Sequence, residues 1–156
     1  MMWTVARPKT KRGRRRLIVV GVDGSVHSRR ALEWALAEAR VRGDRCLVVH
    51  ALDYGHADAA PLVGFLDAMT AAAREVLDTE VAFARHSRHK VKGLLISGPA
   101  AGALLGASRD ADLLVLGSRG KSGLSAALGG SVSTAVLHQA SCPVVVVPSK
   151  DEAGTP

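Results

Sequence analysis

The sequence is poor in aromatic residues, and this shortage restricts how its core can be built. Aromatic residues make up 3% of the 156 residues, whereas hydrophobic residues of all kinds make up 47%. A core with few aromatic rings has to consist of Val, Leu, Ile and Ala, a composition that favours a β-branched sheet covered by Ala- and Leu-rich helices. The length suits one domain of ordinary size.

Long apolar runs and paired cysteines are also lacking. No apolar stretch approaches the roughly 20 residues of a membrane helix, and the basic N-terminus has no apolar segment of the kind found in secretory signals. We therefore expect a cytoplasmic protein without a membrane span. Cys46 and Cys142 form no CxxC pair and are interpreted as buried thiols. The histidines show no HExxH pattern, and no metal site is predicted.

Acidic residues are absent from the first 16 positions, which carry seven Lys and Arg. The other 14 basic residues equal the 14 acidic ones, so the net charge of +7 arises in this segment. The sequence thus predicts a disordered basic tail over residues 1–16, a formally neutral domain over 17–148 and a polar C-terminal tail over 149–156. The basic character is interpreted as a property of the tail and not of a face of the domain.

Three interpretations of the basic tail stay open. It is a solvated arm without a partner, or residues 7–16 bind nucleic acid or an anionic surface through counterion release, or translation starts downstream of Met1. Trp3 is the only aromatic residue of the tail, so stacking on bases has little support.

Short apolar runs alternate with helical patterns along the rest of the chain. Continuous apolar runs predict strands over 17–22, 45–51, 91–97, 112–117 and 144–147. Apolar residues at three- and four-residue steps predict helices over 28–42, 62–86, 100–107 and 132–139. Ser28 is expected to cap the first helix and Trp34 to lie on its inner side. This order predicts an α/β fold, a single-domain open sheet of five parallel strands with helices on both faces.

The place to look for a site follows from that fold class. Open parallel sheets bind ligands at the carboxyl ends of strands, where the strand order reverses. The first and fourth predicted strands end in the segments Asp23-Gly24-Ser25 and Gly117-Ser118-Arg119-Gly120. We expect these two loops to form the site.

The loop after the fourth strand suits a phosphate group. Gly117 and Gly120 allow backbone N–H groups to approach an anion closely, since no Cβ stands in the way. Gly130-Ser131 opens a helix, whose first N–H groups and positive dipole end would face the same space. A flexible connector of small residues remains the plain alternative.

Side chains near these loops would complete the site. Ser131 and Ser133 offer hydroxyl donors, whereas Lys121 and Arg119 would either neutralise phosphate charge or face solvent. Asp23 would accept a hydrogen bond from a ribose hydroxyl or the adenine amino group, or would bind a phosphate-bound Mg²⁺.

Two better known phosphate-binding motifs are excluded. Gly120-Lys121-Ser122 looks like the end of a P-loop, but that motif needs a glycine at position 115, where this chain has Val115. The segment Gly21-Val22-Asp23-Gly24 does not fit the G-x-G-x-x-G pattern of dinucleotide-binding folds. There is also no G-x-S-x-G nucleophile elbow.

The glycine spacing resembles the ATP-binding branch of the universal stress protein family, which is marked by G-x2-G-x9-G-[ST]. Gly117, Gly120, Gly130 and Ser131 stand at this spacing. The wider context agrees, with Asp23 and Ser25 after the first strand, His50-Ala51 at the end of the second, Gly98-Pro99 after the third and Cys142-Pro143 before the last. The resemblance covers about residues 16–148 and implies a Rossmann-like, adenine nucleotide α-hydrolase-like fold.

The resemblance also implies roles for single positions. Asp23 and Ala51 would lie beside the base and ribose, with looser packing on the adenine than where the family has a larger aliphatic residue in place of Ala51. Members commonly form homodimers through the last strand, here Val144–Val147, and an exposed apolar edge strand would otherwise invite aggregation. Leu116 and Gly117 would contact the nucleoside. The complete set of candidate cofactor-binding residues is Asp23, Ser25, Ala51, Leu116, Gly117, Gly120, Lys121, Gly130, Ser131, Val132 and Ser133.

The expected function is that of an ATP-binding stress-response regulator, in which the nucleotide orders the loop and changes a dimer or partner surface. AMP and cyclic AMP are alternative ligands. A slow ATPase or another nucleotide-handling enzyme on the same fold is the main alternative, although the sequence shows no clear base or water-positioning group for attack on a γ-phosphate. Nucleic-acid binding through the basic tail is the other.

Overall fold

The computed structural model describes residues 15–55, 63–86, 90–119 and 131–148. Predictions that concern residues 1–14 and 149–156, and the candidate residues Gly120, Lys121 and Gly130, lie outside this part of the chain. The strands are β1 (Leu17–Val22), β2 (Arg45–Leu52), β3 (Val91–Ser97), β4 (Leu113–Gly117) and β5 (Val144–Val147), and the helices are α1 (Val26–Arg42), α2 (Val63–His86), α3 (Ala100–Ala107) and α4 (Ser131–Gln139).

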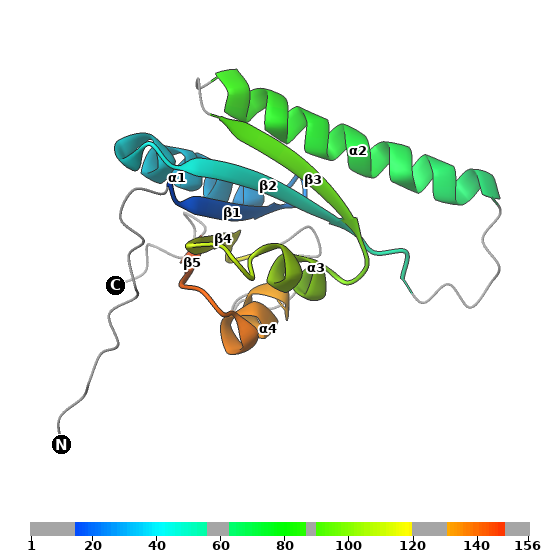
Figure 1. Cartoon of the computed structure of the whole chain (residues 1–156). Coiled ribbons are helices and arrows are strands. Elements are labelled where there is room, and N and C mark those ends of the chain that lie inside the picture. Colours follow the sequence, from blue (N-terminus) through cyan, green and yellow to red (C-terminus); the bar gives the residue numbers. More distant parts are fainter. Residues whose placement is uncertain (1–14, 56–62, 87–89, 120–130, 149–156) are drawn as a thin grey trace, which may run out of the picture.

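The strands form one parallel sheet in the order β3-β2-β1-β4-β5 (Figure 1). The chain moves outward from β1 to β2 and β3, and then returns to the other side of β1 to form β4 and β5. The strand order therefore reverses between β1 and β4, which opens a crevice at their carboxyl ends. The predicted α/β fold with five parallel strands is confirmed.

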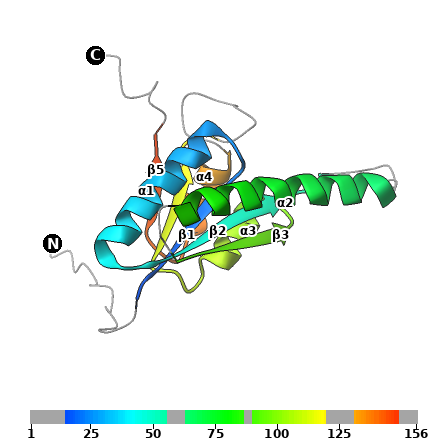
Figure 2. The ribbon, with the colours of Figure 1, turned by 90° about the horizontal axis from the view of Figure 1, so that it is seen from above.

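Helices cover both faces of the sheet, as Figure 1 shows with α1 and α2 above and α3 and α4 below. Side chains of β1 alternate accordingly: Ile18, Val20 and Val22 pack in the core under α1 and α2, whereas Val19 packs in the core toward α3 and α4. Viewed from above in Figure 2, α1 and α2 lie over the sheet. Both cores are almost entirely aliphatic, as the composition predicts.

Helix α1 differs from the sequence prediction at its start and on one face. Its N-cap is Ser25, whose side chain accepts a hydrogen bond from the N–H of Ser28, so Ser28 belongs to the first turn. Trp34 is 38% exposed and does not lie on the inner side, which small residues and leucines occupy instead. The helix ends at Gly43, where φ is 69°.

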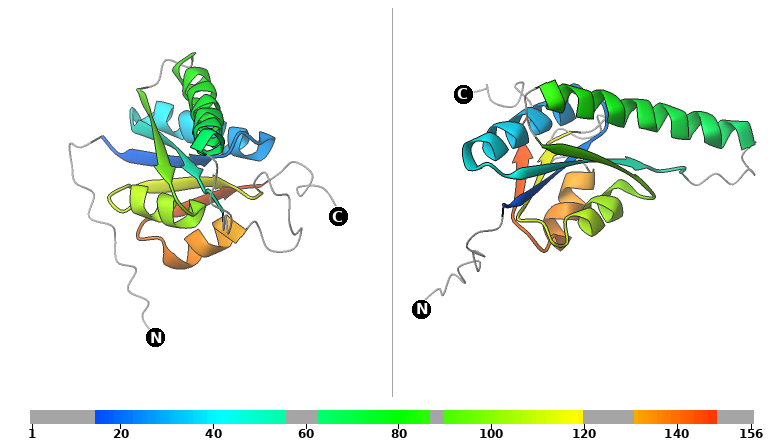
Figure 3. Two further views of the ribbon diagram at one scale, coloured as in Figure 1. Left: turned by 90° about the vertical axis from the view of Figure 1, so that its right-hand side faces the viewer. Right: turned by 45° about the horizontal axis from the view of Figure 1, so that its top comes forward.

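Helix α2 crosses over β2 and β3, and its first half extends beyond the ends of these strands (Figures 1 and 3). Its second half is tied to α1 by a two-pronged ion pair, in which Arg29 Nε and Nη2 donate to the carboxylate of Glu80 over 2.7 and 3.1 Å. The Arg29 guanidinium also lies 4.1 Å from the centre of the Phe83 ring. This contact joins the two helices over the same face.

Both cysteines are free thiols, and they differ in depth. Burial of Cys46 in the core raises the pKa of its thiol to about 12. Burial also raises the pKa of Cys142, which is only half-buried. Within the described residues, no helix combines the length and apolarity needed to cross a bilayer, and no three potential metal ligands of the His, Cys, Asp and Glu types cluster together.

Candidate functional site

A cleft of about 670 Å³, open to solvent, lies at the carboxyl ends of β1, β2 and β4. Its size falls within the range of about 300–1,000 Å³ that is usual for small-ligand sites. Helix α3 contributes one wall through Ala100 and Leu104, and the first turn of α4 contributes another. The lining residues are Gly21, Val22, Asp23, Ser28, Val49, His50, Ala51, Ala100, Leu104, Leu116, Gly117, Arg119, Ser131, Val132 and Ser133.

The structure brings most of the predicted site residues that it describes to this cleft. Ser25 is the exception, because its hydroxyl caps α1 and does not line the cavity. Gly120, Lys121 and Gly130 lie outside the described residues. The residues that line the cleft as predicted are Asp23, Ala51, Leu116, Gly117, Ser131, Val132 and Ser133.

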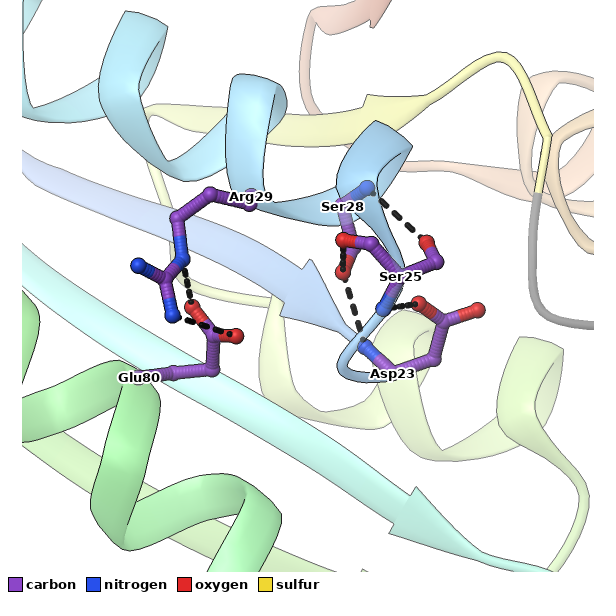
Figure 4. Close-up of polar contacts among 5 residues, drawn as sticks. All are labelled: Asp23, Ser25, Ser28, Arg29 and Glu80. Atoms are coloured by element: carbon purple, nitrogen blue, oxygen red, sulfur yellow. Dashed lines mark hydrogen bonds and ion pairs between the residues drawn. The ribbon is translucent and has the colours of Figure 1, made fainter.

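Asp23 is fixed in position by a closed set of hydrogen bonds, which Figure 4 shows. Its Oδ1 accepts from the N–H of Ser25 over 2.9 Å, and its own N–H donates to the Ser28 hydroxyl over 3.2 Å. The Ser28 hydroxyl in turn donates to the carbonyl of Ser25. The carboxylate is half-buried at the end of β1, so it is held at the rim of the cleft with little freedom.

Glycines keep the cleft open and let the chain pass close by. A Cβ at Gly21 would lie 2.8 Å from Leu116 Cδ2 and 2.9 Å from Leu104 Cδ2, both on the cleft lining. A Cβ at Gly117 would lie 2.8 Å from the carbonyl oxygen of His27, in the first turn of α1. Gly117 therefore has a packing reason to be glycine, besides any approach of a phosphate.

His50 is a cleft residue that the sequence interpretation assigned to the packed end of a strand. Its Nδ1 lies 2.7 Å from the carbonyl oxygen of Val22, its register partner on β1. Because a carbonyl only accepts, Nδ1 must carry the proton, and in the neutral ring Nε2 is then the acceptor. The position of His50 at the end of a strand beside β1 was the signal that could have identified it.

Other cleft residues were missed for different reasons. Gly21, Val49 and Leu104 belong to a strand or helix pattern that explains them fully as core residues, so nothing in the sequence marks them. Arg119 was considered as a phosphate partner or a solvated side chain, and it lines the cleft in a half-buried position. Ser28 was interpreted as a helix cap, and its hydroxyl instead holds the Asp23 backbone.

The first turn of α4 gives the cleft a positive end. Ser131, Val132 and Ser133 all line it, and the first N–H groups of a helix have no partner within the helix. The macrodipole adds roughly half a positive charge at this end. With the Arg119 guanidinium nearby in the lining, this side of the cleft is suited to an anion, whereas Asp23 and His50 provide hydrogen-bonding groups on the other.

Comparison with known proteins agrees with this architecture. The family model described as "Universal stress protein family" matches residues 14–148. A Thermus aquaticus universal stress protein is 34% identical over 139 residues, covering 83% of this chain and 96% of the relative. A universal stress protein of Mycobacterium tuberculosis is 30% identical over 158 residues, covering 94% of this chain and 51% of the relative, so the chain spans about half of that protein's length.

A solved structure shares both the fold and a nucleotide complex. The universal stress protein from Archaeoglobus fulgidus in complex with dAMP superimposes with a TM-score of 0.66 at 27% identity, covering 84% of this chain and 96% of that one. The family model, the identity to full-length relatives and the fold all agree. This chain belongs to the universal stress protein family.

Proposed function

We propose that the cleft binds an adenine nucleotide, ATP foremost, and that the chain acts as a nucleotide-responsive regulator of the stress-response type. The observation that carries the proposal is that Asp23, Gly117 and the first turn of α4 meet around one cavity at the point where the strand order reverses. Each was selected from the sequence on chemical grounds, and they come from segments about 100 residues apart.

The chemistry of the lining suggests how the nucleotide would lie. Apolar side chains of Ala51, Leu104 and Leu116 offer a surface for the adenine, and the Asp23 carboxylate offers an acceptor for a ribose hydroxyl. The triphosphate would extend toward Ser131 and Ser133, where helix N–H groups, hydroxyls and Arg119 favour negative charge. Mg²⁺ would arrive bound to the phosphates, since Mg²⁺ commonly takes only one or two protein carboxylates beside them.

Support for an adenine nucleotide also comes from the dAMP complex of the Archaeoglobus fulgidus relative. That complex leaves AMP and cyclic AMP as alternatives to ATP. We place ATP first because the glycine spacing belongs to the ATP-binding branch and because the positive end of the cleft would gain more from three phosphates than from one.

Binding without efficient hydrolysis is the simpler proposal. Asp23 is the only carboxylate among the described residues of the cleft lining, and its Oδ1 accepts a hydrogen bond from the Ser25 backbone. Attack on a γ-phosphate needs a group that positions or deprotonates water, and Asp23 lies at the end of the cleft that we assign to the ribose.

A second copy of the chain is the proposed partner at β5. This strand is one edge of the sheet, and all four of its valines are half-buried. Pairing of two β5 edges would satisfy their backbone groups and bury apolar side chains that otherwise invite aggregation. Because β5 follows α4, nucleotide bound at the start of α4 could influence this interface.

The test is equilibrium binding of ATP, AMP and cyclic AMP to the full chain by calorimetry, with ADP release measured in parallel. Ala51→Phe should weaken ATP binding at least tenfold, because the ring would occupy the cleft without altering its charge. Ala37→Phe is the matched control, since Ala37 is exposed on α1 outside the cleft. If no adenine nucleotide binds at millimolar concentration, or if both variants bind alike, the proposal is wrong.

A further inference from the structure

Exposed basic side chains gather at the end of the sheet opposite the cleft. They lie where β1, β2 and β3 begin and where α1 and α2 end, an arrangement that can be followed at the tails of the β1, β2 and β3 arrows in Figure 1. We call Arg15, Arg16, Arg40, Arg45, Arg85 and Lys90 the amino-end cluster, and all six side chains are exposed. Four of the six lie within the domain, so the basic character does not belong to the N-terminal tail alone.

The strand register brings three of these residues side by side. Arg45 donates its N–H to the carbonyl of Arg16 over 2.9 Å, and Cys46 donates its N–H to the carbonyl of Lys90 over 3.4 Å. Arg16, Arg45 and Lys90 thus stand at the starts of three adjacent strands, which are about 4.8 Å apart. Cationic groups this close lie within a Debye length of about 8 Å, so they repel one another.

Nearby carboxylates do little to offset this charge. Asp44 Oδ1 accepts from the N–H of Arg16 over 3.1 Å, and Asp112 Oδ2 accepts from the N–H of Leu17 over 2.8 Å. Both groups therefore bond to the backbone at the start of β1. None of the six cluster side chains forms an ion pair with another described residue.

A structural explanation covers only part of the cluster. Arg40 and Arg85 lie in the last turns of α1 and α2, where a positive charge stabilises the helix dipole. Arg16, Arg45 and Lys90 begin strands, and strands have only a small net dipole. Their juxtaposition costs free energy in the isolated chain and would be favourable beside a polyanion.

We propose that the amino-end cluster binds the phosphate backbone of nucleic acid, without reading its sequence. Five of the six residues are arginines, whose planar guanidinium groups bind phosphate oxygens in pairs. Evenly spaced cations on adjacent strands match a ligand with regularly repeated phosphates. An anionic membrane fits less well, because interfacial sites place aromatic side chains beside basic ones, and the exposed aromatic residues of the described part, Trp34 and Phe65, lie in the middle of α1 and near the start of α2.

The test measures anisotropy of a fluorescein-labelled DNA duplex and of the matching RNA duplex as the full chain is titrated at several salt concentrations. In the double variant Arg45→Gln with Lys90→Gln, the slope of log K against log salt should become shallower by about 2, with an affinity loss on the order of tenfold or more at 0.1 M salt. Arg30→Gln with Arg74→Gln is the matched control. It removes the same net charge from other parts of α1 and α2 and should leave the slope unchanged.

Further arms separate the competing outcomes. If deletion of residues 1–14 abolishes binding while the Arg45 and Lys90 double variant retains it, the tail alone binds and the proposal is overturned. Equal losses in both double variants would show a net-charge effect and also overturn it, as would binding to phosphatidylserine vesicles but not to either duplex. Saturating ATP should leave duplex binding unchanged, so this result and the outcome of the nucleotide proposal are independent.

Discussion

The two ends of the sheet are built in different ways. At the carboxyl end, Asp23, Ser25 and Ser28 are locked together by hydrogen bonds, and Gly117 passes within van der Waals contact of the α1 backbone. At the amino end, charged side chains project into solvent, and the acids bond to backbone N–H groups. The first arrangement suits a small ligand that must be held at defined atoms. The second suits an extended anion that needs only charge at regular intervals.

This difference predicts how each end responds to substitution. Changes at the carboxyl end should alter stability and nucleotide affinity together, because the same hydrogen bonds that support the fold position the candidate ligand groups. Exposed side chains at the amino end should tolerate substitution with little loss of stability, since surface changes away from caps and cores usually cost less than about 0.5 kcal/mol.

Two ion pairs of equal length provide the sharpest contrast. Arg29–Glu80 and Arg42–Glu38 both have an N–O distance of 2.7 Å, but the Glu80 side chain is 4% exposed and the Glu38 side chain 28%. Glu80→Ala should lower the free energy of unfolding by about 2–3 kcal/mol, less than the full cost of breaking a buried pair because Arg29 is 30% exposed.

The control for this prediction is Glu38→Ala, which removes an i,i+4 pair at the amino end of the sheet and should cost under about 0.5 kcal/mol. Urea denaturation followed by circular dichroism measures both variants. Equal losses in the two would show that burial does not distinguish the two ends.

Gly117→Ala tests how tightly the carboxyl end is packed. The new Cβ would lie 2.8 Å from the carbonyl oxygen and 2.9 Å from the carbonyl carbon of His27. Since these are backbone atoms, the start of α1 would have to move, at a cost of about 1–3 kcal/mol. Thermal unfolding measures the loss.

Gly102→Ala is the matched control for this change. Gly102 lies within α3, and a Cβ added there would meet no atom of another segment within 4 Å. Alanine in a helix is favoured over glycine by about 0.5–1 kcal/mol, so Gly102→Ala should stabilise the chain slightly. A Gly117→Ala protein as stable as the wild type would mean that the two segments do not pack as closely as described.

Local patterns predicted much of the fold and about half of the cleft. The ranges of β3, α3 and β5 agree with the sequence prediction because glycine, proline or a change of polarity marks their ends. Asp23 and Gly117 could be selected because each directly follows or ends an apolar strand. Trp34 was placed wrongly because helical spacing defines the centre of an apolar face better than its margin, and Trp34 lies at the margin.

Features that depend on register between distant segments could not be predicted. Nothing local indicates that Gly117 would meet the His27 carbonyl, since the two are 90 positions apart. Counting charges over residues 17–148 gave a neutral domain, yet parallel strand order gathers basic residues at one end. His50 lines the cleft only because β2 is the neighbour of β1. Composition describes amounts, whereas topology determines where they accumulate.

The smallest predicted effect separates ligand binding from support of the fold at Asp23. Asp23→Asn keeps an oxygen that can accept from the Ser25 N–H, whereas Asp23→Ala removes it. If the carboxylate accepts a ribose hydroxyl, both variants should weaken ATP binding, Ala by about tenfold and Asn by less, because only Asn can still accept a neutral hydrogen bond. Ser25→Ala should cost about 1 kcal/mol of stability through the lost cap and leave ATP affinity unchanged. Calorimetric titration beside thermal unfolding distinguishes the two roles: if ATP affinity falls with Ser25→Ala as much as with Asp23→Ala, the aspartate acts only through the turn that starts α1.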